Sequence, residues 1–178
     1  LMGDPTETAL YEYAFSKGYD KTELERQYPR VAEIPFDAER KCMTTVHRYG
    51  DKYIAIVKGA MEMLMLKADD VSAAKAWEEP LNKMLADGLR VLGFGIKVFD
   101  KLPAEINPES VENQLRLKGI AGIIDPPREE ARPAVHECKA AGIKPVMITG
   151  DHPVTAATIA KRLGIIESKE DRILSGAE

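Results

Sequence analysis

The chain has 178 residues, of which 44% are hydrophobic and 30% charged, and its formal net charge is −4. This balance is typical of a folded globular protein, and the interleaved charges exclude the basic tracts that bind nucleic acid or anionic membranes. Two cysteines without a CxxC pair and three scattered histidines argue against a disulfide framework or a structural zinc site.

No stretch of the sequence approaches the roughly 18 consecutive apolar residues that span a bilayer. These residues are therefore expected to lie in water. The chain begins on residues typical of a helix start and ends in the polar stretch SKEDRILSGAE, which predicts that it is a piece of a longer polypeptide.

Two helices are predicted at the start. Residues 5–17 carry apolar side chains at helical spacing, and Gly18 can end that helix. A short second helix is predicted after Asp20, because Asp20 followed by Glu23 resembles a capping box, and Pro29 stops it.

A β-hairpin is predicted next. Residues 42–49 and 52–59 are rich in β-branched and aromatic side chains, and only Gly50 and Asp51 separate them. Glycine at the first position of a two-residue loop suits a type II′ turn.

Further helices and a strand follow the hairpin. One helix is predicted from Ala60, and another from near Ser72 to Gly88. Residues 89–99 alternate with a period of two, which predicts a strand. Its apolar face carries Leu92, Phe94, Ile96 and Val98.

The pattern changes in the last third. A buried strand is predicted at residues 118–125, a helix at 129–142, a short strand at 143–149, and a helix at 153–164. Strands that alternate with helices are typical of a parallel sheet. We therefore predict an antiparallel α+β domain with flanking helices, followed by half of a doubly wound α/β domain.

The predicted junction of the last strand and helix reads Thr149-Gly150-Asp151. In open parallel sheets ligands bind at the carboxyl ends of strands, where the N-terminus of the next helix attracts phosphate. A carboxylate beside phosphate needs Mg²⁺, a ribose hydroxyl or a cationic side chain between them. The alternative is that Asp151 or His152 only caps the helix.

A second candidate site lies in the α+β part. Phe36 offers a flat ring on which adenine could stack, five residues before Lys41. Lys58 and Gly59 end a strand, which suits a cation at the floor of a pocket. The alternatives are that Phe36 belongs to the core, that Lys41 is solvated, and that Lys58 and Gly59 only terminate the strand.

Two other charged residues are candidates for the same site. Glu7 could accept a hydrogen bond from an adenine amino group or from a partner lysine, and Arg90 could reach a polyphosphate. Either could equally be an ordinary surface charge.

Six short motifs occur in a fixed order along the chain. They are GxxxETA from Gly3, FxxxRKxM from Phe36, KGA from Lys58, LR from Leu89, DPPR from Asp125 and TGD from Thr149. Each is unspecific alone, but all six in this order and spacing resemble the P-type cation-transporting ATPases, most closely the calcium-pump-like subgroup. The resemblance covers nearly the whole chain.

The resemblance implies two domains. Residues 1–124 would be the nucleotide-binding domain, and residues 125–178 would be an incomplete phosphorylation domain with a haloacid-dehalogenase-like Rossmann fold. Phe36 would be the adenine platform, with Lys41, Lys58 and Gly59 in the pocket. Glu7 would contact adenine or its neighbours, and Arg90 phosphate or ribose. Thr149, Gly150 and Asp151 would then meet the γ-phosphate when the domains close.

The implied function is that of a cation pump. In the intact protein, ATP with Mg²⁺ would phosphorylate an aspartate, and hydrolysis of that intermediate would move a cation, by family analogy calcium, across the cell membrane. This part would be cytoplasmic, joined to the rest of the same polypeptide. The family's Asp-Lys-Thr-Gly-Thr nucleophile is absent from this sequence, so the chain is expected to bind ATP without hydrolysing it.

One departure from the family pattern concerns phosphate. Relatives of the calcium pump often carry arginine two residues after the phenylalanine, where this chain has Ala38. Arg40 is a candidate substitute. Two other functions stay open from the sequence: a soluble capped haloacid-dehalogenase-like phosphatase or phosphotransferase, and a binding module whose lysines are only surface charges.

Overall fold

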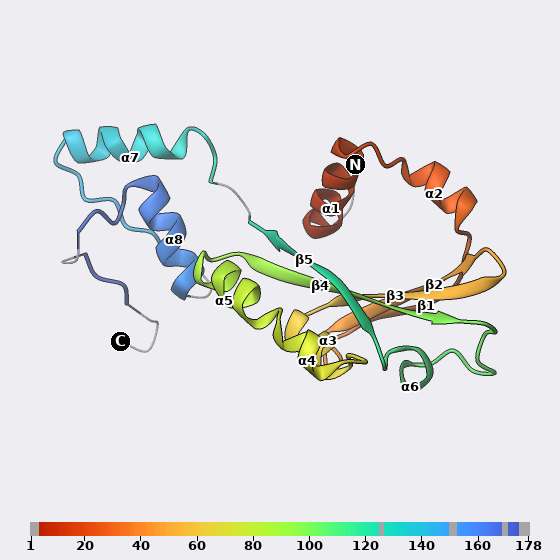
Figure 1. The fold of residues 1–178 in the computed structure, drawn as a ribbon. Coiled ribbons are helices and arrows are strands. Elements are labelled where there is room, and N and C mark those ends of the chain that lie inside the picture. Colours follow the sequence, from red (N-terminus) through yellow and green to blue (C-terminus); the bar gives the residue numbers. More distant parts are fainter. Residues whose placement is uncertain (1–3, 125–126, 150–152, 169–170, 175–178) are drawn as a thin grey trace. The chain divides into compact units, whose positions relative to one another are not determined.

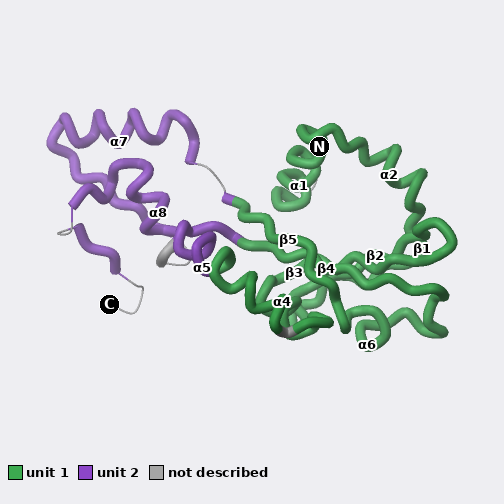
Figure 2. Tube along the Cα trace, viewed as in Figure 1, with its two compact units in different colours: residues 1–81, 91–123 green, residues 82–90, 124–178 purple. Residues whose placement is uncertain are grey.

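The computed structural model describes most of the chain (Figure 1). The described residues are 4–124, 127–149, 153–168 and 171–174. Their contacts divide the chain into two compact units, residues 1–81 with 91–123, and residues 82–90 with 124–178 (Figure 2). Among the described helices, none is long and apolar enough to cross a membrane.

A five-stranded sheet forms the centre of the first unit, in the order β1-β2-β3-β4-β5 (Figure 1). Its strands are β1 (Arg30–Asp37), β2 (Cys42–Tyr49), β3 (Lys52–Gly59), β4 (Arg90–Phe99) and β5 (Arg116–Ile123). The pairs β1–β2, β2–β3 and β3–β4 are antiparallel. The predicted α+β domain with an antiparallel sheet is confirmed.

The hairpin of β2 and β3 has the predicted bounds. Cys42 lies opposite Gly59 and Tyr49 opposite Lys52, so the register runs unbroken along both strands. Gly50 has a φ of 62°. A positive φ at the first loop position is what a type II′ turn requires, and glycine adopts it without steric cost.

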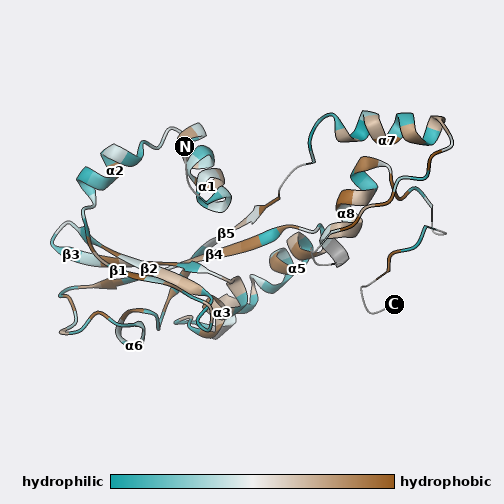
Figure 3. Ribbon diagram, turned by 180° about the vertical axis from the view of Figure 1, so that it is seen from behind, coloured by the Kyte–Doolittle hydropathy of each residue, from teal (hydrophilic) through white to brown (hydrophobic). Residues whose placement is uncertain are grey.

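Two helices lie over one face of the sheet in both ribbon views (Figures 1 and 3). They are α1 (Pro5–Ser16) and α2 (Lys21–Gln27), both predicted from the sequence. The Asp4 carboxylate caps α1 by accepting from the Thr6 N–H at 2.8 Å, and Asp20 caps α2 by accepting from the Glu23 N–H at 3.0 Å. These caps satisfy N–H groups that the first helical turn leaves unpaired.

The hydrophobic core lies on the opposite face, under α3 (Met61–Leu66) and α6 (Pro108–Val111). Side chains alternate along a strand, so β2 and β3 each send every second residue into this core. Fully buried core side chains are Cys42, Val46, Ala55, Val57, Leu64, Val111 and Leu115. The predicted apolar stripe of β4 falls on the other face, because Phe94 lies opposite Lys58 and Ile96 opposite Ile56. Figure 3 shows the hydropathy of each residue along the ribbon.

Glycines in β3 and β4 allow neighbouring segments to pack closely against these strands. A Cβ built on Gly59 would lie 2.4 Å from both the Cys42 Cβ and the Lys41 carbonyl oxygen, and one on Gly93 would lie 3.0 Å from the Met61 Cα. Real Cβ atoms do not approach backbone so closely. These glycines are therefore required by close packing, which the sequence pattern did not predict.

Replacing Gly59 with alanine is expected to lower the free energy of unfolding by about 3 kcal/mol, because the strands must separate to admit the methyl group. Chemical denaturation measures it. Gly119→Ala in β5 is the matched control, since nothing lies within 4 Å of a Cβ built there. Equal midpoints for the two variants would contradict the packing described.

The prediction of a single helix from Ser72 to Gly88 is wrong. The structure has two helices, α4 (Val71–Lys75) and α5 (Glu78–Ala86). Pro80 explains the break. In a continuous helix the backbone N–H of residue 80 would bond the Ala76 carbonyl, and proline has no such N–H. Proline is tolerated in the first turn of a helix, which is where Pro80 lies in α5. The predicted stop at Gly88 is confirmed, with a φ of 75°.

The predicted strands of the parallel sheet differ in the structure. Residues 118–125 were expected to form a buried strand, but the side chains of β5, which lies beside β4 in the sheet of the first unit, are exposed or half-buried. Residues 143–149 form no strand, and Val146 and Ile148 are 74% and 93% exposed. A strand needs a partner for its backbone groups, and the described residues of the second unit offer none.

The helices of the second unit are confirmed. They are α7 (Ala131–Ala140) and α8 (Pro153–Leu163), the latter with proline at its first position as predicted. The Ile143 N–H bonds the Cys138 carbonyl at 2.8 Å where α7 ends. Gly142 there has a φ of 74°, the left-handed conformation that commonly ends helices.

Candidate functional site

An ion pair joins α1 to the sheet in the first unit. The Lys58 ammonium, on β3, pairs with the Glu7 carboxylate, on α1. The Lys58 side chain is only 17% exposed and that of Glu7 is 57% exposed. Lys58 therefore does not simply extend into solvent, and one predicted site residue holds another.

Phe36 lies near the end of β1, next to Asp37, which is opposite Cys42. The β1–β2 register is irregular between Ile34 and Asp37, so strand alternation does not assign the Phe36 side chain to one face of the sheet. Lys58 lies between the buried Val57 and Gly59. Phe36 is 65% exposed. The alternative that Phe36 belongs to the core is wrong.

Lys41 ends the turn between β1 and β2. Its φ of 49° is left-handed, and its N–H bonds the Asp37 carbonyl at 2.8 Å. Its carbonyl accepts from the Ala60 N–H at 2.9 Å, which ties this turn to the residue that follows Gly59. The segments that carry Phe36, Lys41, Lys58 and Gly59 are thus adjacent in space.

The other predicted site residues are Arg90, Thr149, Gly150 and Asp151. No described contact brings them to the segments that carry Phe36 and Lys58. Arg90 begins β4 and is exposed, and it belongs to the second unit together with the exposed Thr149. Gly150 and Asp151 lie outside the described residues. The predicted phosphate-binding turn therefore stays a prediction.

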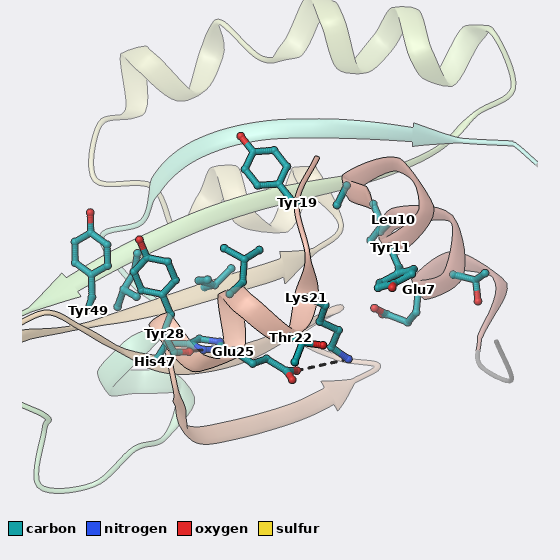
Figure 4. Close-up of a pocket in the computed structure, with 15 residues that line it drawn as sticks. Glu7, Leu10, Tyr11, Tyr19, Lys21, Thr22, Glu25, Tyr28, His47 and Tyr49 are labelled. Atoms are coloured by element: carbon teal, nitrogen blue, oxygen red, sulfur yellow. Dashed lines mark hydrogen bonds and ion pairs between the residues drawn. The ribbon is translucent and has the colours of Figure 1, made fainter. Parts of the chain in front are cut away.

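A hollow of about 900 Å³ lies beside Glu7, between α1, α2 and the sheet (Figure 4). Its lining is mostly apolar and aromatic, and includes Tyr11, Tyr19, Tyr28, Tyr49, Ile54 and Ile56. A Lys21–Glu25 ion pair of 3.6 Å lies at its edge (Figure 4). Neither Phe36 nor Lys41 lines it. No local sequence pattern indicates this hollow, because its tyrosines are scattered along the chain.

A buried carboxylate was also missed. Glu112 is 2% exposed and accepts hydrogen bonds from Arg40, from the Lys67 ammonium at 2.8 Å and from the Thr44 hydroxyl at 2.8 Å. Burial alone would raise its pKa, but the hydrogen bonds from Lys67, Arg40 and Thr44 together lower the pKa of Glu112 below its ordinary value. Glu112 is therefore ionised at neutral pH.

Arg40 is committed to this buried cluster. Its side chain is 20% exposed, one guanidinium nitrogen pairs with Glu112, and the other donates to the Pro35 carbonyl at 2.8 Å. The guanidinium is therefore held at the buried Glu112 carboxylate. This placement does not favour Arg40 as the substitute phosphate contact.

The two cysteines are expected to differ in reactivity. Burial, followed by the charge of Glu112, raises the pKa of the Cys42 thiol, and its side chain is fully buried, whereas Cys138 is half-buried. A thiol reagent should therefore label Cys138 in the native protein and Cys42 only after unfolding. Mass spectrometry of labelled peptides measures this, and native labelling of Cys42 would contradict its placement.

Comparison with known proteins identifies the family. Residues 1–130 match the family model described as P-type ATPase, cytoplasmic domain N. The chain belongs to the P-type ATPase family. In this family context, the ion pair of Glu7 with Lys58 and the exposed ring of Phe36 lie in the part of the chain that the N-domain model matches.

Several curated relatives match nearly the whole chain. A protein named calcium-transporting ATPase 1 from Bacillus cereus is 39% identical over 176 residues, covering 93% of this chain and 20% of the relative. A protein of the same name from Lactococcus lactis is 38% identical over 189 residues, covering 100% of this chain and 21% of the relative. A protein named cation-transporting ATPase pma1 from Synechocystis is 41% identical over 174 residues, covering 93% of this chain and 19% of the relative. The chain thus spans about a fifth of the length of these relatives.

Proposed function

We propose that the chain binds ATP as the nucleotide-binding part of a P-type cation-transporting ATPase. The observation that carries this proposal is the exposed ring of Phe36, in the segment whose Lys41 carbonyl bonds the Ala60 N–H directly after Lys58 and Gly59. Adenine stacks on Phe36, and Lys41 and Lys58 supply positive charge for the phosphates. Glu7 accepts from the adenine amino group or holds Lys58, and Arg90 contacts phosphate or ribose.

The proposed whole protein hydrolyses ATP through an aspartyl-phosphate intermediate and moves a cation across the cell membrane. We propose calcium as the cation, because two of the relatives above are named as calcium-transporting. Phosphoryl transfer of this kind depends on positioning and on neutralising charge. The chain lacks the Asp-Lys-Thr-Gly-Thr nucleophile motif, so it binds ATP without turning it over.

Mg²⁺ belongs to the proposed function only as the companion of the ATP phosphates. Among the described residues, no cluster of three or more His, Cys, Asp or Glu side chains could hold a metal ion. No step of the proposal therefore runs through a metal held by these residues, and Asp151 lies outside them.

The second part of the proposal concerns residues 125–178. We assign them to a phosphorylation domain with a haloacid-dehalogenase-like fold, in which Thr149, Gly150 and Asp151 meet the γ-phosphate. Two helices, α7 and α8, frame residues 143–149, which have no regular secondary structure and whose apolar side chains are largely exposed. An apolar segment between helices is what a parallel sheet incorporates when neighbouring strands are supplied by the rest of the polypeptide.

The test of ATP binding is a titration followed by NMR chemical shifts. One stacked ring and a few half-exposed polar contacts should give a Kd of about 1 mM for ATP. Phe36→Ala should weaken binding at least about fivefold, because stacking of a base on an aromatic ring contributes about 1 to 3 kcal/mol.

Tyr13→Ala is the matched control, since Tyr13 is 66% exposed and Phe36 is 65% exposed, but Tyr13 lies on α1. The control should bind ATP as the wild type does. Unchanged spectra of the wild type at several millimolar ATP would refute the proposed function, and equal losses in both variants would refute the role of Phe36.

A further inference from the structure

The buried Glu112 lies beside the place where residues 36–41 and residues 58–60, the two candidate nucleotide-binding segments, are hydrogen-bonded to each other. It follows α6, and its carboxylate binds the turn after β1 through Arg40 and the end of α3 through Lys67. Arg40 and Glu112 are 72 residues apart in the sequence. A single carboxylate therefore connects three distant stretches of the first unit.

The Arg40 arm fixes the shape of the turn after β1. The Arg40 guanidinium donates to Glu112 and, at 2.8 Å, to the Pro35 carbonyl, directly before Phe36. The Asp37 carboxylate accepts from the Arg40 backbone N–H at 2.9 Å, and its oxygen lies 3.8 Å from the Arg40 Nε. These bonds hold the backbone on both sides of Phe36.

The same turn is linked to Lys58 and Gly59. Lys41 takes a left-handed φ of 49° directly after Arg40, and its carbonyl accepts from the Ala60 N–H at 2.9 Å. A non-glycine residue in this conformation persists only where its surroundings fix it. Here the fixed neighbour is Arg40, which is itself held by Glu112.

We propose that Glu112 is a positioning residue of the nucleotide site: through Arg40 it sets the turn that carries Phe36 and Lys41. This inference rests on the proposed function. Glu112 does not touch the nucleotide, because it is 2% exposed and both carboxylate oxygens already accept hydrogen bonds from protein groups. Its negative charge acts by holding the Arg40 guanidinium.

The two arms of Glu112 allow a discriminating experiment. Glu112→Gln keeps the shape and removes the charge, whereas Lys67→Met removes the cation of the other arm, which is attached to α3 and not to the turn. ATP titration by NMR should show a Kd about threefold to tenfold higher in Glu112→Gln. Lys67→Met should bind ATP within about twofold of the wild type.

Amide hydrogen exchange of Lys41 and Ala60 without ATP is the second readout. Exchange should be faster in Glu112→Gln than in Lys67→Met, because only the first variant releases the turn. A merely structural role of the cluster would accelerate both variants alike. If Glu112→Gln does not fold, Arg40→Lys replaces it, since lysine still pairs with Glu112 but cannot also donate in a fixed fork to the Pro35 carbonyl.

The outcomes are separable. Equal ATP affinity of Glu112→Gln and wild type, or equal losses in Glu112→Gln and Lys67→Met, would overturn the positioning role while ATP binding stands. Tighter binding in Glu112→Gln would also overturn it, because it would mean that Arg40, once released, contacts phosphate directly. A wild type that does not bind ATP refutes the proposed function, and the exchange rates then still decide whether Glu112 holds the turn.

Discussion

Replacing Arg40 and Lys67 together with methionine is expected to lower the free energy of unfolding of the first unit by about 3 to 5 kcal/mol at neutral pH. The two cations are the charged partners of Glu112, whose side chain is 0% exposed. Removing both leaves a buried carboxylate that, among the described residues, keeps hydrogen bonds only from the Thr44 hydroxyl and the Cys42 thiol. Such a charge must be neutralised or exposed to water.

The same double variant should reverse the sign of the pH dependence. In the wild type the pKa of Glu112 is lowered, so its contribution to stability is present above its ordinary pKa of 4.5 and is lost as the pH falls through the folded value. Without the cations burial raises that pKa. The variant should therefore gain stability as the pH falls from about 7 to about 5, where the wild-type Glu112 contributes a constant amount.

Urea unfolding followed by the fluorescence of Trp77 measures this, since the chain has one tryptophan and Trp77 lies in the first unit. Differences between variant and wild type at each pH cancel the titration of other groups. Arg48→Met with Lys75→Met is a matched control, because both of these residues are exposed. A parallel pH dependence of the double variant and the wild type would contradict the buried charge cluster.

The elements that the sequence predicted well are those with local causes. The hairpin of β2 and β3 needs only two alternating runs and a glycine with a positive φ between them, and its bounds were predicted correctly. The cap at Asp20 acts on an N–H group three residues away. Such features depend on neighbours in the sequence and so can be predicted from it.

The elements that the sequence failed to predict depend on distant partners. Glu112 is 68 residues from Thr44 and 45 from Lys67, and no local pattern signals that they meet. Residues 143–149 have the composition of a strand, yet a strand forms only when a second one supplies hydrogen-bond partners. Their apolar pattern predicted a β-strand, but the described residues of the second unit supply no neighbouring strand with which they could pair.

The candidate site shows the same division. Phe36 and Lys58 could be proposed from short motifs, and the pairing of Cys42 with Gly59 then brings the segments that carry them together. Lys58 and Glu7 are 51 residues apart in the sequence. From the sequence, a lysine was one of two partners considered for Glu7, the other being the amino group of adenine. The hollow beside Glu7 could not be predicted, because it is formed by side chains of α1, the α2 region, β2 and β3 together.

Leu115→Ala is expected to lower the free energy of unfolding by about 3 to 5 kcal/mol, because Leu115 is fully buried and its loss leaves a cavity. Its backbone N–H bonds the Lys67 carbonyl at 2.8 Å and its carbonyl accepts from Asp69 at 3.0 Å. The backbone therefore stays anchored when the side chain is shortened. Leu66→Ala, at a position 81% exposed, is the control and should change stability little.

A second substitution makes this prediction specific. A Cβ on Gly95 would lie 3.3 Å from both the Cβ and the Cδ1 of Leu115, so Gly95→Ala alone is crowded. In the Leu115→Ala background the contact with the Cδ1 is gone and the contact with the Cβ remains, so the added methyl group is less crowded. The double variant should therefore be more stable than the sum of the single effects by about 1 to 2 kcal/mol, measured by the same urea unfolding. Additive effects would mean that Leu115 does not lie on Gly95, and the segment that carries Glu112 would then not be anchored as described.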